Sequence, residues 1–377
     1  MNDILAPALF EPHVRRTAIA TEPSKGPVAR RRAVTVGGGH GQAAMLEALL
    51  ELDCDVTAVV SVADDGGCSG RLRRVSGMPP PGDLRRCLST LAADRELAAR
   101  FETRLEGADE MRRSVGNLIL YEAYLDRGSL SAAVRWAQGC LACRGRVLPV
   151  ADVAGKLTVY DRGRGVIAGE STIERVGDHP MVASVHGPQR CVPEALEAIR
   201  EADVVVLGPG SFVTSTLAAV MTGDLAEAIA TTSATRLMVQ NLATEGWERG
   251  PAWTIEQRRL LRDHLCIGSG VDDFEMLVLE HGSTHERRAA EPRTTVVTSP
   301  LVDAARPDHH DSVCVAAALE RHLGIRRRAR RDDRPAAVPA HLLDELERYV
   351  DLALDRLARG ELTPGHGCAR TLQRRPA

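Results

Sequence analysis

The sequence predicts an α/β protein with a Rossmann-like, doubly wound, mostly parallel sheet and a small antiparallel β-hairpin added to it. Short, almost wholly apolar runs such as residues 56–63 and 204–207 are typical of strands buried on both faces. They alternate with segments whose apolar residues recur at helical spacing. Twice, a glycine cluster stands where such a run passes into a helix, as in dinucleotide-binding folds.

The elements follow in order from residue 33. Residues 33–36 are expected to form a strand, 41–52 a helix and 56–63 a second strand, which together make a βαβ unit. Four helices are expected next, near residues 82–92, 96–105, 115–126 and 129–138. In residues 156–172, apolar and polar residues alternate on either side of the sequence DRGRG, which predicts the hairpin.

The α/β alternation then returns. It predicts a helix from residue 193, the strand Val204–Leu207, a second glycine loop and another helix. Further strands are expected in RLMVQNL, FEMLVLE and TTVVTSP, and a last helix of this region ends at Gly324.

Four parts are predicted along the chain. They are a mobile N-terminal tail at residues 1–32, a nucleotide-binding α/β domain at 33–324, a basic linker at 325–338, and a C-terminal amphipathic helix with a tail at 339–377.

Composition narrows the possible partners. The 377-residue chain has a formal net charge of −3 and only 3% aromatic residues, so we expect no nucleic acid partner. Its nine cysteines lack the spacing of a disulfide framework. No uncharged apolar run approaches the roughly 20 residues of a membrane span, and the first residues lack the continuous apolar stretch typical of a signal peptide, so we expect no membrane contact and a cytoplasmic location.

The first glycine cluster occupies residues 37–41. Glycine permits positive φ angles and close approach of a ligand, and the N–H groups at a helix start favour an anion, so phosphate is the expected guest. Gln42 stands where the dinucleotide fingerprint has its third glycine, so neither nicotinamide nor flavin is expected. His40 either contacts a phosphate or substrate oxygen or simply adopts the turn.

Two adjacent acids, Asp64 and Asp65, end the second strand. A carboxylate there can contact a ribose hydroxyl, and the pair could hold Mg²⁺. Residues 66–70 are read as a flexible run of backbone and hydroxyl donors, with Arg71 and Arg73 as charge clamps. Asp83 is placed either to cap the helix that follows or to meet the ligand, and Arg85 to contact the ligand.

The second glycine loop, residues 208–211, follows another buried strand. Both loops should emerge at the carboxyl edge of the sheet. If they flank the point where the strand order reverses, they face one crevice, and that shared crevice is the central expectation.

The motifs VTVGGGHGQ, VVSVADDGGCSGRLRR, PPPGDLRRCL, SVGNLIL, VVVLGPGSFVTS and VQNLATE occur in this order. With them the sequence, from about residue 33 to about residue 324, resembles the gluconeogenesis factor family (YvcK type), which is related to the 2-phospho-L-lactate transferases (CofD-like). The resemblance implies a homo-oligomer that binds a uridine-diphosphate sugar, and a role in carbon metabolism, cell-wall supply and cell shape. The transferase relatives use Mg²⁺.

The resemblance also adds two residues to the site. Asn117 and Asn241 fall on asparagine positions of the family, where an amide suits a base edge or a sugar hydroxyl. Cys68 stands at a usual serine and Arg113 at a usual histidine, which leaves open a divergent paralogue with a changed ligand.

The predicted site is therefore specific. The predicted ligand-binding residues are Gly37, Gly38, Gly39, His40, Gly41, Asp64, Asp65, Gly66, Gly67, Ser69, Arg71, Asp83, Arg85, Asn117, Gly208, Gly210, Ser211 and Asn241. Asp64, Asp65 and Arg85 are the catalytic candidates, and Asp64 and Asp65 the metal candidates. The functions considered are a regulatory factor that binds a UDP-type sugar, a Mg²⁺-dependent transferase for a nucleotide-activated phospho-substrate, and, least favoured, a nicotinamide oxidoreductase.

Overall fold

The computed structural model describes residues 30–105, 113–161, 163–176, 180–186, 190–242, 251–267, 269–271, 274–283, 285–288, 293–327 and 338–361. The helices and strands of these ranges all belong to one unit, Arg31–Ala377. The predicted tail lies outside the described residues except for its last three. Most of the predicted linker and the end of the predicted C-terminal part also lie outside them.

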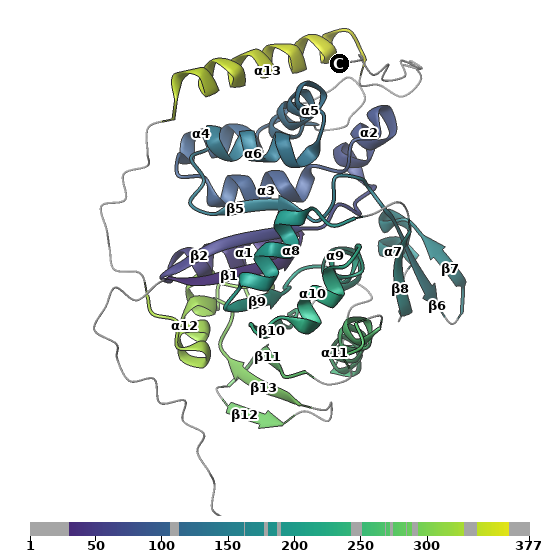
Figure 1. The fold of residues 1–377 in the computed structure, drawn as a ribbon, viewed down its shortest axis with the longest axis vertical. Coiled ribbons are helices and arrows are strands. Elements are labelled where there is room, and N and C mark those ends of the chain that lie inside the picture. The colour runs from purple at the N-terminus through teal and green to yellow at the C-terminus, as the bar shows by residue number, and fades with distance from the viewer. Residues whose placement is uncertain are drawn as a thin grey trace, which may run out of the picture. The chain divides into compact units, whose positions relative to one another are not determined.

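A central sheet of eight strands has the order β12-β13-β11-β10-β9-β1-β2-β5. Its strands are β1 (Arg31–Gly37), β2 (Cys54–Val60), β5 (Arg146–Pro149), β9 (Val204–Leu207), β10 (Thr235–Val239), β11 (Met276–His281), β12 (His285–Arg288) and β13 (Thr294–Ser299). Neighbours pair in parallel, except for β12, which runs antiparallel to β13. The predicted mostly parallel sheet is confirmed (Figure 1).

The strand order reverses at β1. From β1 the chain crosses through α1 (Gly39–Leu50) to β2 on one side, whereas β9, on the other side of β1, leads on to β10. The loops after β1 and β9 therefore leave the sheet as neighbours at the carboxyl edge, the place where ligands bind in such sheets.

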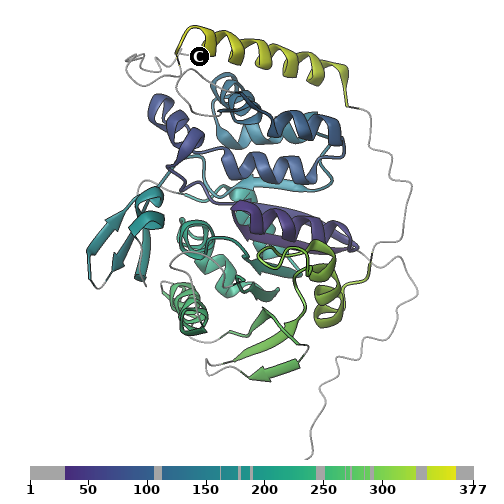
Figure 2. The same ribbon diagram turned by 180° about the vertical axis from the view of Figure 1, so that it is seen from behind.

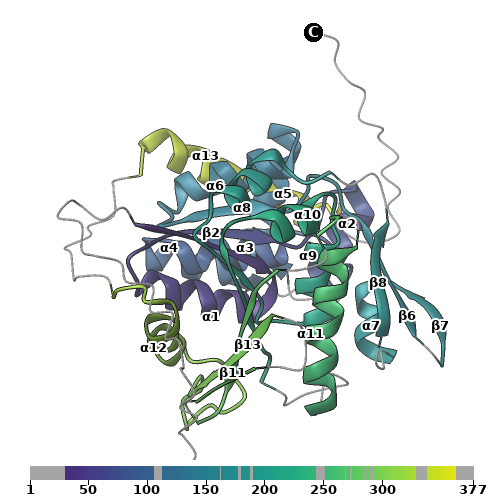
Figure 3. The same cartoon turned by 60° about the horizontal axis from the view of Figure 1, so that its bottom comes forward.

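Helices cover both faces of the sheet (Figure 3). On one face α1 packs against α3 (Gly82–Leu91) and α12 (Ser312–Leu323). On the other face α10 (Leu225–Thr231) packs against α8 (Pro193–Glu201) and α11 (Pro251–Cys266). The strands between these layers are almost entirely buried; β9, for example, is buried at all four positions. This is why they read as continuous apolar runs.

A second helical group extends from α3. It contains α4 (Arg95–Glu102), α5 (Val115–Arg127), α6 (Leu130–Cys140) and α13 (Ala340–Ala358), with a short pair of strands, β3 (Arg104–Leu105) and β4 (Arg113–Ser114). Helix α13, yellow in Figure 2, lies along α5 and α6. There Tyr349 meets Trp136 edge to face, with 4.8 Å between ring centroids.

The predicted hairpin is confirmed and gains a third strand. A separate antiparallel sheet has the order β7-β6-β8, from β6 (Lys156–Asp161), β7 (Gly165–Ala168) and β8 (Pro180–His186). The expected second strand ends early, because helix α7 (Glu170–Val176) begins two residues after β7.

The expectation that residues 66–70 form a flexible run is wrong. It forms the start of helix α2 (Gly67–Ser76), which ends at Gly77 with a φ of 74°. Glycine is needed at position 70, because a Cβ there would lie 1.9 Å from the carbonyl oxygen of Asp65. The glycines therefore serve helix packing as well as loop freedom.

Within the described ranges, no single helix is long and apolar enough to cross a bilayer. Two helical segments joined at a bend, Phe212–Val220 and Leu225–Thr231, together have the length and apolar composition of a span.

Candidate functional site

The two glycine loops pack directly against each other. A Cβ on Gly41 would lie 2.5 Å from the carbonyl group of Pro209, and one on Gly210 would lie 2.8 Å from the carbonyl oxygen of Gly38. No side chain fits at either place, so glycine is required for this contact. The convergence expected from the strand order is therefore present in the structure.

Asn241, at the end of β10, holds the second loop. Its Nδ2 donates to the carbonyl oxygen of Gly210 at 2.6 Å, and its Oδ1 accepts from the Gly210 N–H at 3.1 Å. The amide thus donates to and accepts from the backbone of the loop, and its contact with a base edge or sugar hydroxyl stays a prediction. Asn241 also lines the cavity described below.

Asp83 occupies the start of α1, where a phosphate was expected. Its carboxylate accepts from the N–H of Gly39 and, at 3.0 Å, from Nη1 of Arg86. A Cβ on Gly38 would lie 2.3 Å from Asp83 Oδ2. Asp83 does not cap its own helix, α3. The N-cap residue of that helix is Pro81, and no side chain caps it. The first glycine cluster is thus built around a carboxylate of the protein itself.

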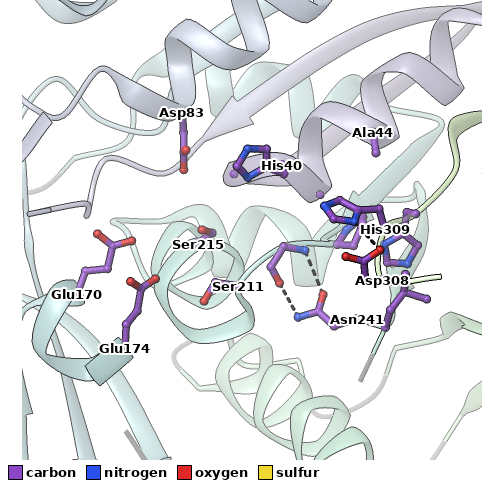
Figure 4. Close-up of a pocket in the computed structure, with 16 residues that line it drawn as sticks. His40, Ala44, Asp83, Glu170, Glu174, Ser211, Ser215, Asn241, Asp308 and His309 are labelled. Atoms are coloured by element: carbon purple, nitrogen blue, oxygen red, sulfur yellow. Dashed lines mark hydrogen bonds and ion pairs between the residues drawn. The ribbon is translucent and has the colours of Figure 1, made fainter. Parts of the chain in front are cut away.

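A cavity of about 670 Å³ opens over both loops (Figure 4). It is lined by Gly39, His40, Gly41, Ala44, Asp83, Glu170, Glu174, Pro209, Gly210, Ser211, Ser215, Asn241, Leu242, Asp308, His309 and His310. Asp83, Glu170 and Glu174 lie at one end and His309 at the other, beside Asp308; His40, Ser211 and Ser215 lie between the two ends. We call this the main cavity.

The carboxylate end contains two residues that the sequence analysis missed. Glu170 and Glu174 stand one turn apart on α7 and point toward the cavity in Figure 4. Burial, followed by the hydrogen bond and charge of Asp64, raises the pKa of Glu170. Burial likewise raises the pKa values of Glu174 and Asp83. The charges of Arg86 and Arg85 oppose this shift at Asp83, whereas neighbouring carboxylates add to the shifts of Glu170 and Glu174.

The predicted metal pair divides between two tasks. Asp65 Oδ1 accepts from the backbone N–H of Ser171 at 2.9 Å and from its Oγ at 2.6 Å, which fastens the start of α7. Asp64 remains beside the cavities, where it bonds Glu170 and accepts from the N–H of Gly66 at 2.7 Å. Asp65 is therefore an anchor of α7, and its part in a metal site beside Asp64 stays a prediction.

Oxygen donors of the kind Mg²⁺ prefers do collect here, from Asp64, Asp83 and Glu170. In the part of the chain that the structure describes, no three His, Cys, Asp or Glu side chains form an assembled metal-binding group. These carboxylate oxygens are ligands of the type that Mg²⁺ prefers, and the three side chains would have to move closer together to bind the ion.

The histidine end is formed by the segment after β13. His309 Nδ1 lies 3.0 Å from Asp308 Oδ1. Burial lowers the pKa of His310 to about 4, and its buried Nε2 has no hydrogen-bond partner among the described residues. Burial also lowers the pKa of His40, with the charge of Arg86 contributing. His310 is therefore neutral at neutral pH and can accept a hydrogen bond from a ligand.

A second cavity of about 250 Å³ meets the first at Asp83. It is lined by Asp64, Gly66, Cys68, Ser69, Gly82, Asp83, Arg85, Arg86, Arg104 and Asn117. Arg85, 2% exposed, donates from Nη1 to Ser114 Oγ at 2.6 Å and pairs from Nη2 with Glu102 at 3.3 Å.

The predicted ligand-binding residues thus fall into three groups. Gly39, His40, Gly41, Asp83, Gly210, Ser211 and Asn241 line the main cavity. Asp64, Gly66, Ser69, Arg85 and Asn117 line the second cavity. Gly37, Gly38, Asp65, Gly67, Arg71 and Gly208 line neither. Arg73, read as a charge clamp, donates instead to the carbonyl oxygens of Asp64 and Gly155.

Comparisons with known proteins agree with this architecture. The family model described as 2-phospho-L-lactate transferase CofD matches residues 33–317. A Thermotoga maritima protein is 34% identical over 310 residues, which are 77% of this chain and 98% of that relative. The gluconeogenesis factor of Bacillus subtilis is 34% identical over 235 residues, 62% of this chain and 74% of the relative.

A solved structure is also similar. The crystal structure of a Bacillus halodurans protein described as a member of the UPF0052 family has a TM-score of 0.68 and 28% sequence identity, and the match covers 77% of this chain and 99% of that one. With the family model matched over most of the sheet and both glycine loops, the chain belongs to the 2-phospho-L-lactate transferase CofD family and is of the gluconeogenesis factor type.

Proposed function

We propose that this protein binds a nucleotide diphosphate sugar of the UDP-sugar type in the main cavity, and that it acts as a regulatory factor in carbon metabolism, cell-wall supply and cell shape. The observation that carries the proposal is the junction of the two glycine loops at the reversal of strand order, beneath a cavity of about 670 Å³. A cavity of this size and polarity suits a nucleotide-sized ligand. The gluconeogenesis factor relatives support the placement in carbon metabolism.

The middle of the main cavity suits a diphosphate. Gly39 has a φ of 71°, and a Cβ there would meet no atom within 4 Å, so its backbone is open to the cavity. Ser211 and Ser215 add hydroxyls from the opposite wall. At the histidine end, Nε2 of His310 can accept from an N–H of a base or an O–H of a sugar.

Mg²⁺ belongs to the proposal, held by Asp64, Asp83 and Glu170. The ion would supply positive charge between these carboxylates and the diphosphate, where the main cavity lining has neither lysine nor arginine among the described residues. Asp83 would keep its contact with Gly39 and so link the ion to the first glycine loop.

Calorimetric titration of the full chain with UDP-N-acetylglucosamine, with and without Mg²⁺, tests the proposal. We expect saturable binding that Ala44→Phe abolishes, because Ala44 lines the main cavity and the ring would fill it. Glu47→Phe is the matched control, since Glu47 is exposed on the same helix and lines neither cavity. Absence of heat with every uridine nucleotide sugar would refute the proposal.

A second candidate function is a Mg²⁺-dependent transferase that acts on a nucleotide-activated phospho-substrate. The family match and the second cavity beside Asp83 favour it, because a transferase needs room for an acceptor. Transfer of phosphorus-containing groups depends mainly on positioning and charge. Product formed from a nucleotide-activated donor and lost in Asp64→Asn would support this function, and turnover unaffected by that change would rule it out.

The proposal also includes a homo-oligomer in the cytoplasm. Sedimentation velocity of the full chain tests the oligomer, since a single species of monomer mass over a wide concentration range would contradict it.

A further inference from the structure

The second cavity is a compartment of its own. At about 250 Å³ it is smaller than the roughly 300–1,000 Å³ of sites for drug-sized ligands. It touches the main cavity at Asp83, and three arginines line it where the main cavity has none among the described residues. A ligand of the main cavity therefore does not account for its lining.

A buried amide in this lining lacks a partner. Asn117, in the first turn of α5, is 3% exposed, and its Oδ1 is buried without a hydrogen bond to any described residue. Buried polar groups in folded proteins are almost always hydrogen-bonded. Asn117 also lines the second cavity, so a donor bound there is a candidate partner for this buried acceptor.

Three arginines and two carboxylates, those of Asp64 and Asp83, line the second cavity, so its cationic groups outnumber its anionic ones. Arg86 is held by Asp83, and Arg85 by Ser114 and Glu102, so both guanidinium groups have protein partners. The exposed side chain of Arg104 forms no ion pair within the described ranges. Its charge is the one that a ligand can neutralise, in the same cavity as the unpartnered acceptor of Asn117.

We propose that the second cavity is a subsite for a small anion that also carries a hydroxyl or amino donor, such as a hydroxycarboxylate or the phosphate ester of a small polyol. Arg104 pairs with the anionic group, and Asn117 Oδ1 accepts from the donor. The role of this subsite as the place of a second substrate beside the nucleotide rests on the proposed function. The binding of the anion itself does not.

Cys68 reports on occupancy. It is partly exposed and lines the second cavity but not the main one. The rate of its alkylation by iodoacetamide can be followed by peptide mass spectrometry, with Cys314, which is partly exposed on α12 and lines neither cavity, as the internal reference. The probes form matched pairs: glycolate against acetate, and glycerol 3-phosphate against methyl phosphate, at equal ionic strength.

We expect glycolate or glycerol 3-phosphate to slow alkylation of Cys68, and not of Cys314, by about tenfold at ten times the dissociation constant. The pair that protects identifies the anionic group as carboxylate or phosphate. Within that pair, the probe without a polyol or α-hydroxyl should protect less. Equal protection by both members, or no protection by any probe, overturns the proposal.

Two variants assign the contacts. Asn117→Leu should remove the advantage of the hydroxyl-bearing probe, and Arg104→Gln should weaken protection by both members of the pair. Arg104 is exposed, so its variant remains a fair test if the buried substitution impairs folding. Arg100→Gln is the control, since Arg100 is exposed on α4, pairs with Glu96 and lines neither cavity. Protection unchanged in Arg104→Gln overturns the proposal.

Calorimetry with UDP-N-acetylglucosamine on the same preparation separates the two proposals. Nucleotide-sugar binding without protection of Cys68 overturns the subsite alone. Protection of Cys68 without nucleotide-sugar binding supports the subsite and contradicts the function proposed for the main cavity.

Discussion

Glu170 shows how one side chain can couple this site to pH. In the folded protein its pKa lies above the ordinary value of 4.5, with burial as the largest cause and Asp64 as the next. Above pH 4.5 the unfolded chain therefore loses a proton that the folded chain keeps. The folded state loses stability as pH rises from there toward the folded pKa, by at most about 1.4 kcal/mol per pH unit for one proton.

Glu170→Gln should remove this dependence, because the amide resembles the protonated carboxyl at every pH. We expect the melting temperature of the variant to fall less than that of the parent protein between about pH 5 and about pH 8. Thermal unfolding in matched buffers measures it. Identical slopes for the two proteins would mean that Glu170 ionises normally.

Asn241 is the residue that fixes the second glycine loop. Asn241→Ala removes both hydrogen bonds to Gly210 and leaves the N–H and carbonyl groups of that residue without this partner. We expect a loss of about 1–3 kcal/mol in the free energy of unfolding, measured by urea denaturation. The variant should also bind UDP-N-acetylglucosamine more weakly, since Gly210 forms part of the main cavity. Unchanged affinity would place the diphosphate away from this loop.

Helix α13 depends on a buried ion pair. Arg356 Nε lies 2.7 Å from Glu122 Oε1, and the Glu122 side chain is 3% exposed. Burial raises the pKa of Glu122, and the charge of Arg356 opposes that shift. The pair therefore fastens α13 to α5, whose first turn carries Asn117 of the second cavity.

Arg356→Met should destabilise the protein by about 3 kcal/mol, because it leaves a buried carboxylate without its partner. Equilibrium unfolding in urea measures the loss. Arg359→Met is the control on the same helix: Arg359 is exposed and pairs with Asp355, and an exposed pair contributes less than about 1 kcal/mol. Equal losses of unfolding free energy in the two variants would show that the Arg356–Glu122 pair stabilises the fold no more than an exposed pair does.

Helix α7 marks a limit of prediction from sequence. The strands and most helices could be predicted, because buried strands and amphipathic helices leave local patterns. Nothing local shows that Ser171 on α7 reaches Asp65, a contact that joins residues 106 positions apart. The same contact delivers Glu170 and Glu174 to the cavity, so these two acids could not be found from the motifs.

The glycine loops show both sides of that limit. Their convergence could be predicted, because parallel strands on either side of the order reversal must send their loops to one edge. The occupant of the first loop could not, because Asp83 reaches Gly38 and Gly39 from another helix. A glycine cluster at a helix start signals an anion, and the sequence does not distinguish a bound phosphate from a carboxylate of the chain.

The carboxylates, the metal and the ligand should respond to pH as one system. In the proposed function, Mg²⁺ and the nucleotide sugar bind to ionised carboxylates, whereas burial raises the pKa values of Asp83 and Glu170. Burial and Asp64 raise the pKa of Glu170 to about 10, so binding should release its proton, and affinity should increase with pH by up to about tenfold per pH unit.

Calorimetry at about pH 6 and about pH 8, each in two buffers of different ionisation enthalpy, measures the affinity and the proton count together. In Glu170→Gln we expect fewer protons released and a smaller change in affinity, with weaker Mg²⁺ dependence. Affinity that is independent of pH, with no buffer dependence of the heat, would show that the metal and the nucleotide sugar bind without these carboxylates.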